Sequence, residues 1–337
     1  MTFKVLVEPS GHQFSAEAGE FILDAAERQG ISLPYGCRNG MCGTCSGTLI
    51  SGSVTYPEET QGTVDEKPDG YCLTCKATPS SDLAIHLNEV ESEAQEKIRA
   101  LPCKVEKLEQ LSHDVMRVYL KLPENERILF LAGQYLDFMM EDGRRRAFSI
   151  ANAPHNDDLI ELHIRHVPGG KFTDLLFNGI KSGDIFNIQA PMGGFYLREN
   201  SDRPRIFMAG GTGFAPLKGI IEHAIHIGQD CPIHLYWGVR AERDLYLEEL
   251  ASKWAEEQKN LTFVPVLSEP DSGWSGRSGW VHDAVLEDHQ DMSLYDLYMS
   301  GPPVMVFGAK KAFMAARMSE DNMFSDVFEW AQDNPDK

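Results

Sequence analysis

The sequence is poor in positive charge and has no long hydrophobic run. No stretch of about 20 apolar residues occurs, so we expect no membrane-spanning helix. Lysine and arginine total 31 against 51 acidic residues, and the net charge of −20 disfavours a nucleic-acid partner, which needs basic patches. The N-terminal segment MTFKVLVEPS lacks the basic stretch and the apolar stretch of a secretory signal. We therefore expect a cytoplasmic protein with reduced thiols.

The seven cysteines are an odd number, which disfavours a disulfide framework. Four of them follow the spacing C-x4-C-x2-C, with the fourth 30 positions further on: Cys37, Cys42, Cys45 and Cys75. This is the spacing of a plant-type [2Fe–2S] cluster, in which each iron takes two thiolates. The pattern predicts an electron-transfer protein with these four cysteines as metal ligands.

A structural zinc site is the alternative for these cysteines. Four-cysteine zinc sites use two close pairs, which here would be Cys42/Cys45 and Cys72/Cys75. That arrangement leaves Cys37 without a role, so we favour the cluster. The other cysteines are expected to be small buried residues without a function: Cys72, Cys103 and Cys231.

A length of 337 residues indicates two or three domains. Residues 1–92 alternate apolar and polar side chains around one amphipathic segment at 20–30, which predicts a β-grasp ferredoxin domain. The acidic stretch that follows has no apolar period, and we assign residues 93–98 to a linker. Residues 99–199 contain six short strand patterns separated by turn signals, and one helix at 171–180, which predicts an antiparallel β-barrel. Residues 200–337 alternate strands with helices, as in a doubly wound parallel sheet. The expected fold class is therefore multi-domain, α+β and α/β.

A glycine-rich turn opens the third domain. The segment MAGGTGFAP, residues 208–216, places Gly210, Gly211 and Gly213 between a strand and a helix. Glycines there let the backbone approach a pyrophosphate, and the helix N-terminus supplies amide donors. The motif is not G-x-G-x-x-G, and a glycine-rich strand-to-helix turn without a ligand remains an alternative interpretation.

The barrel offers a second set of candidate residues. Arg146 and Phe148 share one face of a strand and Ser149 falls on the other, while a Gly169-Gly170 turn leads into a helix. An arginine can pair with a phosphate and an aromatic ring can cover a flat cofactor. From these residues alone, a core strand with a surface turn is as good an interpretation as a flavin site.

Together, these motifs carry a family resemblance. The order of cysteine loop, R-x-F-S barrel and GGTGFAP domain, followed by YWGVR and SGPPVM, resembles the iron–sulfur flavoprotein reductases of the ferredoxin–NADP⁺ reductase superfamily. Within that superfamily, LHIR, FVPVLS, WSGRSGWVH and MFSDVF are similar to CDP-6-deoxy-3,4-glucoseen reductase-type proteins. Reductase components of bacterial oxygenases share most of the plan.

The resemblance implies a role for each matching position. The residues expected along FAD are Arg146, Phe148, Ser149, His163, Arg165, Gly170, Lys171, Phe172 and Thr173. Those expected around the nicotinamide dinucleotide are Gly210, Gly211, Thr212, Gly213, Ser268, Glu269, Gly301, Pro302 and Phe328. Ser149 and Ser300 would lie at the reacting rings.

The chain departs from many of its relatives at three of these positions. Phe148 replaces a tyrosine, which loses a hydroxyl contact, and Ser300 replaces a cysteine, which puts the efficiency of hydride transfer in question. Relatives that use NADPH tend to have an arginine after the serine at 268, whereas this chain has Glu269. A carboxylate would repel a 2′-phosphate, so we expect NADH, with NADPH possible. Arg277 lies nearby in the sequence and could reverse that preference.

The predicted function is a reductase component that passes electrons from NADH through FAD and the [2Fe–2S] cluster to a separate acceptor protein, either a deoxysugar dehydrase or an oxygenase. Residues 1–95 carry 14 acidic and 5 basic side chains, so docking of the acceptor at an acidic ferredoxin domain is expected, with solubility alone as the alternative explanation of the charge. The alternative functions are an NAD(P)H:flavin or quinone reductase with an auxiliary cluster, and a redox-sensing module.

Overall fold

The computed structural model describes residues 1–36, 38, 40, 43–58, 60, 64, 69–87, 89 and 98–328. Residues 1–96 and 97–337 form two compact units, each of which is described by itself. Two of the predicted cluster ligands, Cys37 and Cys42, and most of the predicted linker lie outside the described residues. The domain boundaries within the larger unit remain a prediction.

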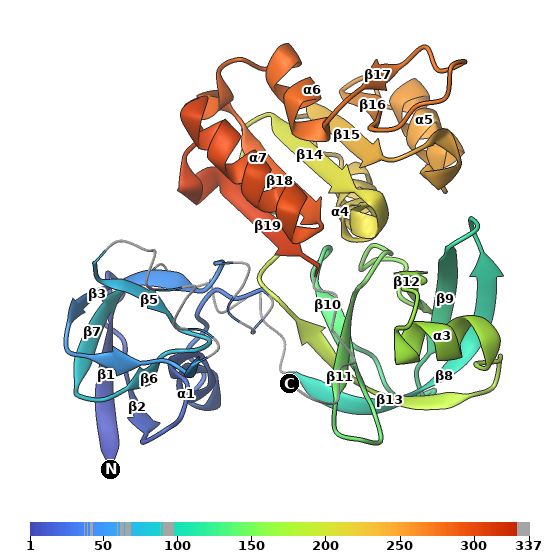
Figure 1. The fold of residues 1–337 in the computed structure, drawn as a ribbon. Coiled ribbons are helices and arrows are strands. Elements are labelled where there is room, and N and C mark those ends of the chain that lie inside the picture. The colour runs from blue at the N-terminus through green and yellow to red at the C-terminus, as the bar shows by residue number, and fades with distance from the viewer. Residues whose placement is uncertain are drawn as a thin grey trace. The chain divides into compact units, whose positions relative to one another are not determined.

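The described part of the smaller unit contains a five-stranded sheet of order β2-β1-β7-β3-β5, a two-stranded sheet of β4 and β6, and helix α1 (Figure 1). Its elements are β1 (Thr2–Glu8), β2 (Gln13–Glu17), α1 (Ile22–Arg28), β3 (Ser46–Ser51), β4 (Val54–Thr55), β5 (Tyr71–Leu73), β6 (Thr78–Pro79) and β7 (Leu83–His86). Strand β1 pairs antiparallel with β2 and parallel with β7. Alternate residues of these strands, such as Val5, Val7 and Ile85, are fully buried, as expected of a sheet with one face on the core.

The larger unit begins with an antiparallel six-stranded sheet of order β11-β10-β13-β8-β9-β12, called here the barrel. Its elements are β8 (Arg99–Gln110), β9 (Val115–Lys121), β10 (Tyr135–Met139), β11 (Arg145–Ser149), β12 (Ile160–Arg165), α3 (Lys171–Asn178) and β13 (Ile185–Met192). A bridge between Ile150 and Leu162 joins the ends of the two edge strands, so the sheet closes on itself. The barrel core is apolar and includes Phe138, which is 2% exposed.

The second part of the larger unit is a parallel six-stranded sheet of order β17-β16-β15-β14-β18-β19. Its strands are β14 (Arg205–Gly210), β15 (Ile233–Val239), β16 (Leu261–Leu267), β17 (Arg277–Ser278), β18 (Asp296–Gly301) and β19 (Met323–Val327). Its helices are α4 (Phe214–His226), α5 (Glu248–Glu257), α6 (Val281–Asp288) and α7 (Pro303–Ala315), with short 3₁₀ turns η2 (Gly211–Gly213), η3 (Glu242–Asp244), η4 (Met292–Leu294) and η5 (Glu320–Asn322).

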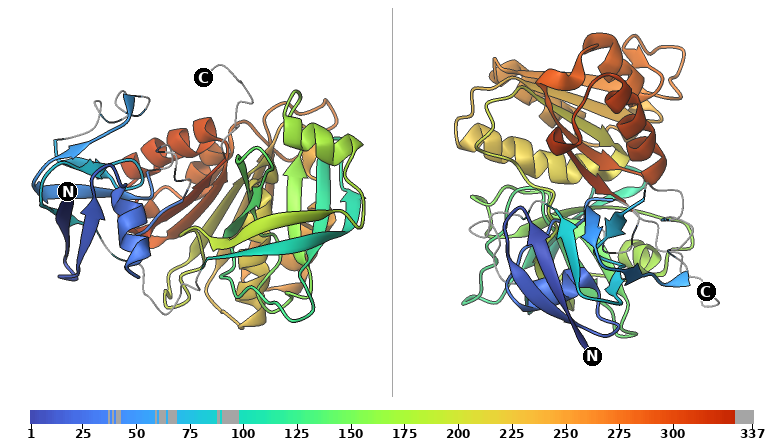
Figure 2. Two further views of the ribbon diagram at one scale, coloured as in Figure 1. Left: turned by 90° about the horizontal axis from the view of Figure 1, so that it is seen from below. Right: turned by 90° about the vertical axis from the view of Figure 1, so that its left-hand side faces the viewer.

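This sheet is doubly wound. The connections outward from the central β14 place α4 and α5 on one face, and the return to β18 places α6 and α7 on the other (Figure 2). All six residues of β14 are buried, because both faces of the strand are covered, and this explains the apolar run that follows Arg205. The terminal strand β19 was not predicted from the sequence, where MFSDVF was recognised only as a motif.

Among the described residues, every helix is too short or too polar to cross a lipid bilayer.

Candidate functional site

The glycine loop, residues 210–213, lies at the carboxyl end of the central strand β14 and leads into α4. A Cβ atom on Gly213 would lie 1.9 Å from the carbonyl oxygen of Ser300, so only glycine fits at this position. Gly211 has a φ of 54°, and its carbonyl oxygen accepts a hydrogen bond from Trp237 Nε1 at 2.9 Å. The core therefore holds the loop in one conformation at the open edge of the sheet.

The other predicted dinucleotide residues gather at the same edge, because parallel strands all end on one side. Gly301 ends β18 beside β14, and a Cβ atom on it would lie 3.1 Å from Gly210 Cα. Pro302 follows it, and the Phe328 amide donates to the Gly301 carbonyl at 3.0 Å. The structure thus brings together residues from the ends of three strands.

Two serines and one carboxylate meet where the barrel approaches this edge. Ser149 Oγ, at the end of β11, donates a hydrogen bond to Asp326 Oδ2 on β19 at 2.8 Å. Asp326 is the register partner of Ser300 on β18. Ser300 is fully buried, and its hydroxyl has no hydrogen-bond partner among the described residues. An orphaned buried hydroxyl beside two polar side chains fits the reacting end of a flavin and a nicotinamide.

The predicted flavin residues of the barrel lie on β11 and at the start of α3. Phe148 is half-buried and packs 5.4 Å from Phe172, centroid to centroid, so one part of its ring belongs to the core. Gly170 is the residue before α3, and Lys171 is exposed. The Thr173 hydroxyl contacts the carbonyl oxygen of Gly170 at 3.1 Å, so it stabilises its own loop. Arg146 is half-exposed on β11. A cradle of an arginine, an aromatic ring and a helix N-terminus suits a diphosphate and a flat ring.

Strand β12 carries His163 and Arg165, which face different surroundings. His163 is buried, and both ring nitrogens contact protein atoms: Nε2 lies 2.8 Å from Glu161 Oε1 and Nδ1 lies 3.1 Å from the Tyr246 hydroxyl. No ring nitrogen is left for a cofactor. Arg165 Nε donates to an aspartate carboxylate at 2.6 Å, and its Nη1 lies 3.8 Å from where a Cβ on Gly211 would be. Arg165 therefore reaches the glycine loop, whereas the cofactor role of His163 stays a prediction.

The predicted coenzyme-discriminating residues follow β16. The Ser268 amide donates to the Val239 carbonyl at 3.0 Å and the Glu269 amide to the Arg240 carbonyl at 2.8 Å, so both lie at the edge that carries the glycine loop. The Glu269 side chain is exposed. Arg277 forms ion pairs with both Glu287 and Asp288. Its charge is thus compensated within the protein, which weakens the case for Arg277 as a phosphate-binding residue.

In the smaller unit, two predicted cluster ligands are described, and both are buried. Cys45 precedes β3, and its carbonyl oxygen accepts hydrogen bonds from the Thr74 amide at 3.1 Å and the Thr74 hydroxyl at 3.0 Å. Because Thr74 directly precedes Cys75, this contact holds the two cysteine segments together. Left-handed backbone at Arg38, Gly40 and Gly43 makes the tight loop that a cluster needs.

Cys72 is fully buried in the core of the smaller unit. Burial raises the pKa of its thiol to about 12, and the thiol contacts the Tyr56 hydroxyl.

Sequence reasoning missed several site residues. Asp326 could have been found from the MFSDVF motif, but nothing local marks Glu161, since a buried charge on a strand is recognised only by its partners.

Comparison with known proteins gives the family. The chain matches the models of a 2Fe-2S iron–sulfur cluster binding domain at residues 5–80, an oxidoreductase FAD-binding domain at 102–196 and an oxidoreductase NAD-binding domain at 207–311. It is 38% identical to the CDP-6-deoxy-L-threo-D-glycero-4-hexulose-3-dehydrase reductase of Yersinia pestis, over 97% of this chain and 99% of that protein. It is 36% identical to the reductase subunit of an aromatic O-demethylase of Amycolatopsis, over 97% and 99%.

Similar solved structures belong to the same kind of reductase. The Amycolatopsis cytochrome P450 reductase GcoB superposes with a TM-score of 0.79 at 35% identity, covering 97% of this chain and 98% of that chain. The ferredoxin reductase of carbazole 1,9a-dioxygenase gives 0.71 at 26% identity, covering 98% and 99%. These matches confirm the fold class, the three cofactors and the enzyme class predicted from the sequence. The chain therefore belongs to the iron–sulfur flavoprotein reductases of the ferredoxin–NADP⁺ reductase superfamily, and it is an NAD-dependent oxidoreductase with FAD and a [2Fe–2S] cluster.

Proposed function

We propose that this protein is the NADH-oxidising component of a two-component system and that its acceptor is a dehydrase acting on a nucleotide-linked deoxysugar. The observation that carries the proposal is the meeting of Ser149, Asp326 and Ser300 at the sheet edge that holds the glycine loop. These side chains would lie where a nicotinamide meets a flavin. FAD, when bound, takes two electrons from the nicotinamide and releases them singly to the cluster, which accepts one at a time.

The choice of acceptor rests on similarity along the whole chain. The Yersinia dehydrase reductase is 38% identical, whereas the terephthalate dioxygenase reductases of Comamonas are 32% identical over the same share of this chain. A dehydrase is therefore the first acceptor to test and an oxygenase the second. We place the protein in the cytoplasm, because cluster assembly needs reduced thiols, which persist there.

The coenzyme choice is supported by the charges around the edge of the sheet. An exposed carboxylate at Glu269 disfavours a 2′-phosphate, and Arg277, the nearby cation that could reverse the preference, is paired with Glu287 and Asp288. NADH is therefore the coenzyme that the residues favour.

The acceptor is proposed to dock on the acidic smaller unit, near the cysteine loop. Arg38, within that loop, pairs with Asp24 at 3.0 Å and with Glu27 at 2.7 Å on α1. These carboxylates therefore border the cluster. A carboxylate-rich surface attracts a basic partner, and this attraction weakens as salt is added.

The experiment that tests the proposal is an anaerobic titration of the purified protein with NADH. Visible absorbance follows the flavin, and electron paramagnetic resonance follows the reduced cluster. Flavin bleaching together with one reduced [2Fe–2S] signal, followed by cluster oxidation on addition of the dehydrase, supports it. Flavin reduction with a silent cluster contradicts it and favours the flavin or quinone reductase.

A second measurement separates these two functions directly. A reductase component reduces protein acceptors such as cytochrome c only with its cluster in place, whereas a flavin reductase reduces free flavin without it. Comparing both acceptors in a cluster-free variant decides between them.

A further inference from the structure

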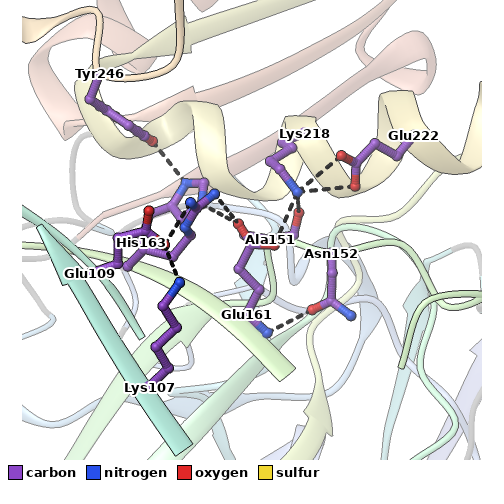
Figure 3. Close-up of polar contacts among 10 residues, drawn as sticks. Lys107, Glu109, Ala151, Asn152, Glu161, His163, Lys218, Glu222 and Tyr246 are labelled. Atoms are coloured by element: carbon purple, nitrogen blue, oxygen red, sulfur yellow. Dashed lines mark hydrogen bonds and ion pairs between the residues drawn. The ribbon is translucent and has the colours of Figure 1, made fainter. Parts of the chain in front are cut away.

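Lys218 is a buried ammonium that joins α4 to the barrel (Figure 3). Its side chain is 6% exposed, and Nζ contacts the carbonyl oxygen of Ala151 at 3.2 Å, Glu161 Oε2 at 3.2 Å and Glu222 Oε1 at 3.0 Å. An ammonium has three protons, and each finds an acceptor. Burial of an unpaired ammonium would cost several kcal/mol, and these contacts offset that cost.

Glu161 connects this lysine to His163. Burial tends to raise the pKa of the Glu161 carboxyl, but hydrogen bonds from His163 and the charge of Lys218 lower it to about 2. The carboxylate is therefore ionised and can only accept, so Nε2 of His163 carries the proton. Burial lowers the pKa of His163, which is therefore neutral, and its Nδ1 accepts a hydrogen bond from the Tyr246 hydroxyl at 3.1 Å.

Tyr246 in turn packs against the residues that hold the glycine loop. Its ring lies 5.1 Å from Trp237 and 6.1 Å from Phe214, both nearly perpendicular. Trp237 stacks on Phe214 at 3.9 Å and donates its indole proton to the carbonyl of Gly211. A continuous chain of contacts therefore runs from His163 on the barrel to the glycine loop.

The other end of the network reaches the strand that carries Ser149. Ala151, whose carbonyl binds Lys218, is two residues beyond Ser149 in the chain. One residue after Lys218, a Cβ on Gly219 would lie 2.9 Å from the carbonyl oxygen of Asn152, so backbone packs directly on backbone. Helix α4 itself begins immediately after the glycine loop.

We propose that Lys218 and His163 are positioning residues that set the separation between the glycine loop and Ser149, and hence between the nicotinamide and the flavin. The network bonds to the backbone next to each reacting group. Lys218 donates to the carbonyl oxygen of Ala151, close to Ser149. Trp237 donates to the carbonyl oxygen of Gly211, within the glycine loop. This inference rests on the proposed function, in which NADH delivers electrons to the flavin. A shift of about 1 Å between reacting groups can cost on the order of 100-fold in rate.

A purely structural ion cluster makes a different prediction. Loss of Lys218 would then lower the melting temperature and the yield of folded protein but leave the rate per bound flavin unchanged. Positioning instead predicts a slower reduction step in protein that is still folded.

The test compares Lys218→Met with Lys218→Met/Glu161→Gln, in which one of the two carboxylates that pair with Lys218 is also neutralised, and with Lys253→Met. Lys253 lies on α5, is 62% exposed and pairs, within the described part of the chain, with Glu257 at i,i+4, so it is the matched control. The measurements on full-length holoenzyme are the limiting rate of flavin bleaching at saturating NADH, the NADH concentration at half-saturation, the melting temperature, and hydrogen exchange of residues 148–153.

We expect both Lys218 variants to lose roughly 10- to 100-fold in limiting rate with little change in half-saturation, and to exchange faster at residues 148–153. The double variant should regain melting temperature but not rate, and chemical reduction of the flavin should still reduce the cluster. Recovery of the rate together with stability, or unchanged rate and exchange, would overturn the proposal. If NADH fails to reduce even the wild-type flavin, the proposed function fails, and hydrogen exchange alone then decides the positioning role.

Discussion

Ser149 on β11 of the barrel donates a hydrogen bond of 2.8 Å to Asp326 on β19, the last strand of the parallel sheet. The two residues are 177 positions apart in the chain. The contact joins β11, which is expected beside the flavin, to β19. On β19, Asp326 is the register partner of Ser300. It orients a hydroxyl at the point where electrons would enter.

Replacement of Asp326 by alanine removes the acceptor that orients Ser149. We expect the limiting rate of flavin reduction by NADH to fall by about 10-fold, because removal of one oriented hydrogen-bonding group at a reacting centre costs on this order. Asp321→Ala, an exposed aspartate in η5, is the control. Stopped-flow absorbance measures both, and equal rates in the two variants would show that the contact has no part in the reaction.

Glu269→Arg should move coenzyme preference toward NADPH, because it replaces a repulsive charge by one that pairs with phosphate. We expect the ratio of kcat/KM for NADPH over NADH to rise by about 10-fold or more. Glu287→Gln/Asp288→Asn, which removes the partners of Arg277, tests whether that guanidinium then contributes. A ratio that stays at the wild-type value in Glu269→Arg rules out this coenzyme pocket.

Gly219→Ala should destabilise the larger unit by roughly 1–3 kcal/mol, since the added methyl meets a backbone oxygen that cannot move aside. Gly308→Ala on α7 is the matched helical control, because nothing lies within 4 Å of its Cβ position. That variant should gain about 0.5–1 kcal/mol. Denaturant unfolding of both variants checks the difference, and equal effects would mean that α4 does not pack closely on the barrel.

The stabilisation provided by Glu161 should depend on pH. Its pKa is lowered from 4.5 to about 2 in the folded protein, so the carboxylate stabilises the fold above pH 4.5, and this contribution is lost as the pH falls toward 2. One pKa unit corresponds to about 1.4 kcal/mol, which gives a contribution of roughly 3 kcal/mol at neutral pH. The difference in unfolding free energy between wild type and Glu161→Gln should be constant from pH 7 to 5 and shrink below that. A difference that grows in acid contradicts the assigned charge state.

Cys75→Ser should abolish the reduced-cluster signal and cytochrome c reduction while NADH still bleaches the flavin. Cys72→Ser, three residues earlier, should retain the cluster, because Cys72 lies outside the C-x4-C-x2-C…C spacing of the predicted ligands. Iron content and electron paramagnetic resonance measure both. Metal loss in Cys72→Ser would revive the two-pair ligand set, and loss of flavin reduction in Cys75→Ser would show that the cluster supports the rest of the protein.

The sequence by itself determined the order of the elements, the four-cysteine spacing and the glycine loop. Apolar periodicity and backbone conformation are local properties, so the periods of 2 and 3.6 and the glycines at 210–213 can be recognised without a partner. The family resemblance added the cofactors, because its motifs occur in a defined order along the whole chain.

Only the tertiary structure decided which charges meet. Nothing in the sequence around Asp326, Lys218 or Arg277 shows that they pair with Ser149, with Glu161 and with Asp288, respectively. Nor does it show that His163 has both ring nitrogens occupied. These contacts join strands and helices far apart in the chain. The closure of the barrel and the winding of the parallel sheet bring the partners together. For Lys218 and Glu161, burial then gives the contact its strength, because a charge removed from water must find its partner within the fold.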